Sequence, residues 1–162
     1  MPRICSRRSV AHKTPEGGRL RGGSVPSTVA NVTNRAANES LVRHIFDAFA
    51  RREGLRLRHV FAPDAVWTVP GRGVMAGDYR GPEQILRFLA RLPRETDGTY
   101  GSRLIDVLAS DDRAAALYRA SGTRHGRTLD LDQVLLFRIE DGLVREVLAL
   151  PADPAVFEAF WA

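Results

Sequence analysis

The chain of 162 residues is 44% hydrophobic and 27% charged, a globular composition that excludes collagen-like, mucin-like and wholly disordered proteins. No run of about 18 apolar residues is present to form a membrane-spanning helix. The single cysteine, Cys5, excludes an internal disulfide and a cysteine-based zinc cluster. The net charge of +5 comes from residues 1–40, so residues 41–162 are neutral overall and are not expected to bind nucleic acid.

Residues 1–33 are predicted to form a disordered basic tail. They are rich in glycine, proline, arginine and serine, and their longest apolar stretch has two residues. Such a segment cannot bury enough surface to offset the entropy of ordering. A weak electrostatic anchor to nucleic acid or anionic lipid is the alternative role of this segment. Because no apolar stretch follows the basic start, it is not a secretory signal, and we expect a cytoplasmic protein without a membrane partner.

Residues 34–162 are predicted to fold as one domain that starts with helices. Apolar side chains recur at helical spacing over residues 41–49, with Asn34 or Asn38 as the N-cap and Gly54 as a left-handed C-terminal residue. A short second helix over 55–61 and a strand over 65–69 follow. A glycine-rich loop then leads to Pro82, which suits the first turn of a helix over 82–92.

Four strands are predicted in the second half of the chain, over residues 99–109, 113–124, 127–139 and 143–150. The tight turns between them are Asp111-Asp112, His125-Gly126 and Asp141-Gly142, and Asp-Gly between apolar runs is a strong hairpin signal. A short apolar helix after Pro154 ends the chain. Helices gathered on one side of an antiparallel sheet define an α+β fold.

The element order and three segments resemble the SnoaL-like branch of the nuclear transport factor 2-like superfamily, which includes polyketide cyclases and relatives of ketosteroid isomerase. The segments are FAPDAVW (61–67) with the following Pro70-Gly71, GDYRGPE (77–83), and FRIEDGLVRE (137–146) with the closing FEAFW (157–161). The resemblance implies a cone, in which a curved antiparallel sheet wraps around helices and leaves an apolar cavity. Because this fold hosts isomerases, cyclases, epoxide hydrolases, dehydratases and non-catalytic binding modules, it does not by itself choose a function.

The acids that act in related enzymes are missing at the matching positions. Ketosteroid isomerases place their base before the proline that follows the first strand, where this chain has Val69. SnoaL-type cyclases and limonene-epoxide-hydrolase-like enzymes place an acid late on the last strand, where this chain reads Leu148-Ala149-Leu150. The resemblance therefore leaves open whether the protein is an enzyme.

Strand register offers one other acid, Glu146. A two-residue turn at Asp141-Gly142 pairs Glu146 with Phe137, and their face is predicted to point into the cavity because the opposite face carries two arginines. Glu146 is then a buried carboxylate with a raised pKa, as a general base or acid requires. The alternative is a structural carboxylate at the rim of the cone that pairs with an arginine.

Four further side chains are candidates for ligand binding. Gln133 lies on the same predicted inner face as Glu146, and Tyr118 of the preceding strand points inward with a hydroxyl that suits an oxyanion donor. Trp67 is expected to line the cavity wall, and His44 borders the apolar stripe of the first helix. For each of the four, the alternative is a purely structural role in the core or at its edge. No spacing of His, Cys, Asp and Glu indicates a metal site, and no cofactor is expected.

Two functions fit these observations. One is an isomerase or cyclase that abstracts a proton next to the carbonyl of a hydrophobic substrate, with Glu146 as the base. The other is a non-catalytic module that binds a ligand or dimerises. In both cases we expect a small hydrophobic partner and a homodimer through the outer sheet face, where Val134, Leu136 and Val147 lie among arginines; pairing through this face is also what the resemblance implies.

Overall fold

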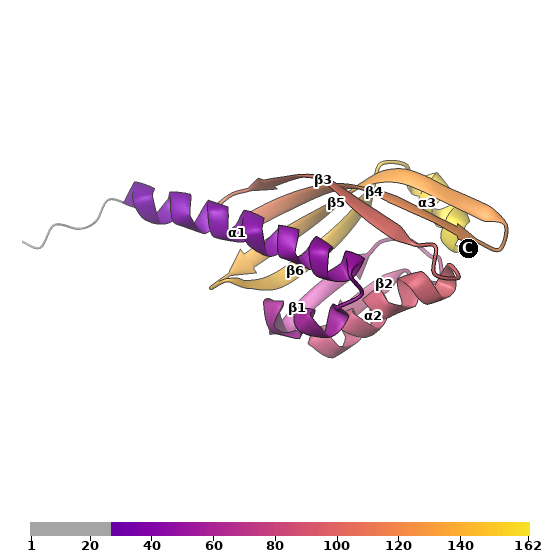
Figure 1. Ribbon diagram of the computed structural model, residues 1–162, viewed down its shortest axis with the longest axis horizontal. Coiled ribbons are helices and arrows are strands. Elements are labelled where there is room, and N and C mark those ends of the chain that lie inside the picture. The colour runs from indigo at the N-terminus through magenta and orange to yellow at the C-terminus, as the bar shows by residue number, and fades with distance from the viewer. Residues whose placement is uncertain (1–26) are drawn as a thin grey trace, which may run out of the picture.

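A computed structural model of the chain describes residues 27–162, with side chains from Asn34 onward (Figure 1). Its helices are α1 (Ser27–Ala50), the short 3-10 helix η1 (Gly54–Val60), α2 (Gly81–Glu95) and α3 (Pro154–Trp161). Its strands are β1 (Phe61–Val69), β2 (Gly77–Arg80), β3 (Gly101–Ala109), β4 (Arg113–Arg124), β5 (Arg127–Glu140) and β6 (Leu143–Pro151). Of the predicted disordered tail over residues 1–33, residues 1–26 lie outside the described residues, whereas α1 already begins at Ser27, upstream of the predicted domain start at residue 34.

The six strands form one curved, unclosed sheet in the order β2-β1-β6-β5-β4-β3. Neighbouring strands are antiparallel except β1 and β6, which run parallel. Helices α1 and α2 lie across one face of the sheet, and α3 lies at the far end of β4 and β5 (Figure 1). The predicted α+β fold with a curved sheet around helices is confirmed. The parallel pair and the short strand β2, which falls in the predicted glycine-rich loop, were not foreseen.

The hydrophobic core fills the space between the sheet and the helices. Its members come from every helix and from the inner face of the strands, and its largest fully buried side chains include Leu57, Ile85, Phe137 and Trp161. Burying large apolar side chains on one face of each element is the main source of stability for such a fold. Within residues 27–162, no helix is both long and apolar enough to cross a membrane.

The C-terminal end of α1 differs from the prediction. The Glu53 N–H donates to the Ala48 carbonyl at 2.9 Å and the Arg52 N–H to the Phe49 carbonyl at 3.0 Å, which is a Schellman motif. The left-handed residue of this motif is Arg52, with φ of 58°, and not Gly54. Asn38 is no N-cap either, because it lies inside the helix, where its amide donates to the Ser110 and Asp111 carbonyls.

Two of the predicted hairpin turns have left-handed backbones at both central residues. His125 and Gly126 have φ of 49° and 77°, and Asp141 and Gly142 have φ of 52° and 74°. Two successive positive φ values are the mark of a type I′ turn, whose twist matches that of the strands. The Asp141-Gly142 turn therefore sets the start of the β5–β6 register as predicted, with Ile139 opposite Val144.

The β5–β6 register then shifts by one residue, which corrects the predicted pairing. Arg138 lies opposite Glu146 and Phe137 opposite Val147, so Arg145 is the extra residue of a β-bulge. Because a shift of one residue exchanges the two faces of a strand, Val147 is buried and Glu146 points outward. The predicted pairing of Phe137 with Glu146 is therefore wrong. The Arg145 guanidinium donates to Asp64 on β1 at 2.7 Å.

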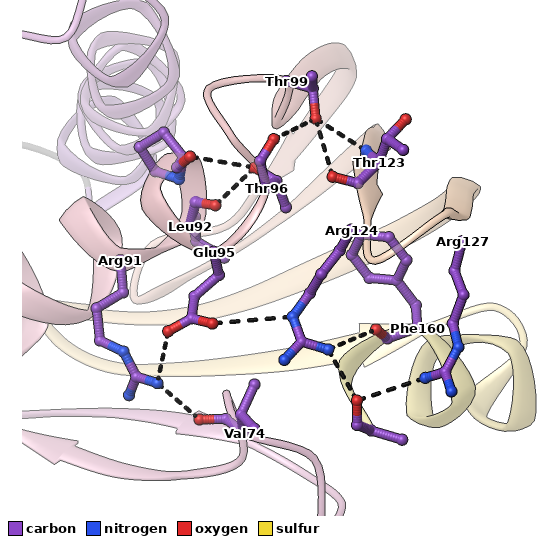
Figure 2. Close-up of polar contacts among 12 residues, drawn as sticks. Val74, Arg91, Leu92, Glu95, Thr96, Thr99, Thr123, Arg124, Arg127 and Phe160 are labelled. Carbon is purple, nitrogen blue, oxygen red and sulfur yellow. Dashed lines mark hydrogen bonds and ion pairs between the residues drawn. The ribbon is translucent and has the colours of Figure 1, made fainter.

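Polar contacts hold α3 against the hairpin of β4 and β5 (Figure 2). The buried Arg124 donates to the Ala162 carbonyl at 2.8 Å and to the Phe160 carbonyl at 3.4 Å, and its Nε lies 3.8 Å from Glu95 on α2. Arg127, directly opposite Arg124 in the ladder, donates to the Ala159 carbonyl at 2.7 Å. These arginines satisfy carbonyls that the last turn of a helix leaves without partners.

Candidate functional site

The sheet and the helices enclose a small inner cavity. It consists of two adjoining spaces of about 40 Å³ each, one against Ile45, Phe46 and Phe49 of α1 and one that reaches Gln133 and α3. Both spaces are bounded by the same five side chains: Trp67, Leu92, Tyr100, Tyr118 and Leu135. A space of this size holds a group of a few atoms and not a ring system.

A larger outer groove adjoins the inner cavity. It has a volume of about 400 Å³ and lies between the end of α1, the middle of α2 and the start of β3. Its floor is shared with the inner cavity and consists of Phe49, Leu89, Tyr100 and Ser102. The Phe49 and Tyr100 rings meet edge to face with their centroids 6.2 Å apart, so these two rings separate the groove from the interior.

The inner cavity has two buried hydrogen-bond donors. The Tyr118 hydroxyl donates to Gln133 Oε1 at 2.9 Å, which turns the Gln133 amide nitrogen to the other side. Within the described part of the chain, Gln133 Nε2 and Trp67 Nε1 are buried and have no hydrogen-bond partner. A buried donor without a partner costs about 1–3 kcal/mol. We call Gln133 Nε2 and Trp67 Nε1 the inner donors; a ligand oxygen is the kind of group that satisfies them.

The tyrosines around the inner donors stay protonated at neutral pH. Burial raises the pKa of Tyr100 to about 12, and burial next to Tyr100 raises the pKa of Tyr118 well above its usual value. A neutral Tyr118 hydroxyl keeps donating to Gln133 and so holds the amide in one orientation. The site therefore presents donors in fixed positions within an apolar wall, an arrangement suited to a carbonyl or another acceptor oxygen.

The lining contains no proton acceptor of the usual catalytic kind. Among the described residues, none that lines the inner cavity is an aspartate, a glutamate or a histidine. General-base catalysis needs such a group within hydrogen-bond reach of the substrate proton. Over the same part of the chain, no group of three His, Cys, Asp or Glu side chains is placed to hold a metal ion.

Three of the predicted ligand-binding residues meet at this cavity. Trp67, Tyr118 and Gln133 all line its inner space. In contrast, the structure places His44 on the exposed side of α1, so it lines neither the inner cavity nor the outer groove as described. This position does not support the expected part of His44 in ligand binding, because the helix presents Ile45 and Phe46 to the cavity instead.

Tyr100 and Ser102, which were not predicted as site residues, lie at the junction between the cavity and the groove. Tyr100 directly precedes β3, and Ser102 is the second residue of that strand. No local pattern marks either residue, because the boundary that they form depends on where α1 and α2 pack against the sheet.

Glu146 lies on the outer face of the sheet, and not in the cavity. Its side chain is 57% exposed, and Arg138 Nη2 donates to its Oε1 at 2.8 Å. The hydrogen bond from Arg138 lowers the pKa of Glu146, the opposite of the shift that burial was predicted to produce. The predicted desolvated carboxylate is therefore wrong in position and in the direction of its pKa, and the alternative of an arginine-paired carboxylate describes the geometry.

Comparison with known proteins identifies close relatives over the same region. Residues 42–147 match the family model of the SnoaL-like domain. The Mycobacterium tuberculosis protein "Uncharacterized protein Rv0034" is 37% identical over 127 residues, which cover 78% of this chain and 97% of that protein. The family match spans the end of α1, helix α2 and strands β1 to β5, which supply most of the lining of the inner cavity, and it ends before α3.

Solved structures share the architecture. Bal32a, from a soil-derived mobile gene cassette, is 32% identical with a TM-score of 0.76, and the match covers 80% of this chain and 99% of Bal32a. TerC, which was co-crystallised with polyporic acid, is 22% identical with a TM-score of 0.67, and the match covers 76% of this chain and 97% of TerC. At that lower identity, the likeness to TerC concerns the fold.

Proposed function

Because this chain belongs to the SnoaL-like domain family, and because its cavity holds two buried donors, we propose that it binds a small hydrophobic molecule with an acceptor oxygen. The observation that carries the proposal is the pair of inner donors, Gln133 Nε2 and Trp67 Nε1, within an apolar wall. A ligand oxygen that accepts from them removes a desolvation cost that the folded protein otherwise bears.

In this proposal, the outer groove and the inner cavity hold different parts of the ligand. A ring or short apolar chain occupies the outer groove, whose volume of about 400 Å³ is in the range of small-molecule sites. Only the carbonyl end enters the inner cavity of about 40 Å³ per space. Passage from one to the other requires the Phe49 and Tyr100 rings to rotate apart. TerC, which has the same fold, also binds a small molecule, polyporic acid.

Binding is better supported than catalysis. Buried hydrogen-bond donors beside a carbonyl also stabilise an oxyanion, which keeps an isomerase or cyclase as the second candidate. Proton abstraction next to a carbonyl needs a base as well, and the described cavity lining offers no aspartate, glutamate or histidine. We therefore propose a binding module with no cofactor.

The test compares 2-acetylnaphthalene with 2-ethylnaphthalene, which have nearly the same shape and differ in the carbonyl oxygen. By calorimetry we expect the ketone to bind the wild-type protein about three- to tenfold more tightly, the effect of one net hydrogen bond. Gln133→Leu should remove most of this preference, because it deletes the donor that the Tyr118 hydroxyl orients.

The matched control is Gln84→Leu, the same substitution at an exposed glutamine of α2, whose oxygen accepts from the Arg80 N–H outside the cavity. This variant should keep the ketone preference. Equal affinities of the wild-type protein for the ketone and the hydrocarbon would contradict the role of the inner donors.

We also propose that two copies pair through the outer face of the sheet. Apolar side chains cover the middle of this face, where Leu136 lies opposite Leu148 and Val134 opposite Leu150, and all three leucines are exposed. Ion pairs flank them, including Arg138 with Glu146 and Arg119 with Asp130. An apolar centre with a charged border is typical of an interface between protein subunits.

Light scattering tests the pairing. The wild-type protein should have twice the chain mass of 17.9 kDa, and Leu148→Asp should have the mass of one chain, because a two-fold axis brings both new carboxylates together in a desolvated patch. Val156→Asp is the control, since Val156 is comparably exposed but lies on α3, away from this face. A wild-type mass of one chain at high micromolar concentration would contradict the proposal.

A further inference from the structure

We infer that the molecule bound in the outer groove carries a carboxylate, and that Arg52 at the rim of the groove pairs with it. This inference rests on the proposed function and names the class of ligand more narrowly: an apolar body with a carbonyl at one end and a carboxylate at the other. It is carried by the conformation, the position and the charge of Arg52.

Arg52 occupies a backbone position that ordinarily favours glycine. It is the left-handed residue of the Schellman motif at the end of α1, with φ of 58°. A side chain with a Cβ is strained in this region, so glycine or asparagine is the common choice. From this backbone position the Arg52 side chain reaches Gly98, in the connection between α2 and β3. The Nη2 atom of Arg52 lies 3.9 Å from the point where a Cβ atom on Gly98 would be.

The guanidinium of Arg52 therefore lies between the two segments that border the groove. Of the described residues that line this groove, Arg52 alone carries a formal charge; the others include Phe49, Leu86, Leu89 and Pro93, with Ser102 and Tyr100 at the floor. Over residues 34–162, the side chain of Arg52 has no carboxylate within 4.0 Å, whereas nearby Arg56 pairs with Glu53 at 3.2 Å. The groove thus combines an apolar wall with one cation at its rim.

A carboxylate is the partner that this cation selects. Guanidinium and carboxylate groups form paired, charge-assisted hydrogen bonds, with a geometry that an alcohol or an amide cannot reproduce. A cationic ligand is disfavoured by the same charge. The inner donors and Arg52 lie on opposite sides of the floor formed by Phe49 and Tyr100, so one ligand reaches both only if its two oxygen-bearing groups are separated by an apolar body.

The test extends the naphthalene series with 6-acetyl-2-naphthoate and its neutral amide, 6-acetyl-2-naphthamide. By calorimetry at neutral pH and low salt, we expect wild-type protein to bind the carboxylate about three- to tenfold more tightly than the amide, the range between an exposed and a bidentate ion pair. The preference should shrink as salt is added. In Arg52→Gly, the two affinities should become equal.

Arg52→Gly is chosen because glycine suits the left-handed backbone, so the variant should fold and melt at the wild-type temperature or above it. Arg51→Gln is the matched control, because Arg51 is an adjacent exposed arginine that does not line the groove as described; it should keep the carboxylate preference. A preference that persists in Arg52→Gly would overturn the inference.

The two proposals fail in different ways. Equal affinities of the wild-type protein for the carboxylate and the amide, together with a ketone preference that Gln133→Leu removes, would overturn the role of Arg52 and leave the proposed function standing. Absence of binding of all four naphthalenes at millimolar concentration would overturn both.

Discussion

Val147→Glu is expected to unfold the domain, whereas Glu146→Gln, one residue earlier on β6, should change its stability by less than about 0.5 kcal/mol. Val147 is 2% exposed and packs in the core, so a glutamate there loses its hydration without gaining a partner. We expect a loss of at least about 4 kcal/mol, a large part of the stability of a domain of this size. Thermal and urea melts followed by circular dichroism measure both variants.

The pair tests the β-bulge at Arg145. If β5 and β6 paired without the bulge, Glu146 would face the core and Val147 would face solvent, and the order of the two effects would be reversed. A stable Val147→Glu protein beside a strongly altered Glu146→Gln protein would therefore contradict the observed register. It would also restore Glu146 as a buried carboxylate and with it the hypothesis of a general base.

Arg124→Met is expected to lower the free energy of unfolding by about 3 kcal/mol or more. Arg124 is 6% exposed, and its removal takes a donor from the Phe160 and Ala162 carbonyls and a neighbouring cation from Glu95 (Figure 2). The Ala162 carbonyl keeps the longer hydrogen bond from Arg127, at 3.4 Å. Leaving buried polar groups without partners is among the costliest effects of a single substitution. Methionine is chosen because it keeps an unbranched apolar stem and removes the guanidinium.

Arg127→Met is the control for this experiment. Arg127 is the cross-strand neighbour of Arg124 and also donates to carbonyls of the last turn of α3, but it is exposed. Water can replace its hydrogen bonds, so we expect a loss of less than about 1 kcal/mol by urea denaturation. Equal losses in the two variants would show that burial of Arg124 does not matter, and that any donor to the end of α3 is equivalent.

Both variants bear on the proposed ligand site, because α3 closes one end of the inner cavity. Phe157 and Trp161 of this helix line the same space as Gln133, and the Val74 N–H donates to the Trp161 carbonyl at 2.9 Å. A protein in which α3 is loosened should therefore lose the wall that keeps water away from the inner donors. The ketone preference of a still-folded Arg124→Met protein is expected to fall with its stability.

Much of the fold follows from local pattern in the sequence. The apolar stripe that begins at Leu41 predicts the packed part of α1, and the Asp141-Gly142 and His125-Gly126 turns predict two hairpins with their loop lengths. Alternation along β4 and β5 places Tyr118 and Gln133 on the inner face, where the structure also has them. These features depend on neighbours in sequence, and a hairpin register counted from its turn is reliable until something interrupts it.

The bulge interrupts it, and only the tertiary structure decides its position. Beyond Arg145 the register goes with the burial of Val147 in the core and with the pairing of β6 to β1, a strand far away in sequence that runs parallel to it. The same long-range packing determines that Glu146 is outside, that His44 is exposed and that Tyr100 borders the cavity. The residue types that we propose to recognise a ligand were visible in the sequence, but which of them face one another was not, because a single extra residue in one strand exchanges its two faces.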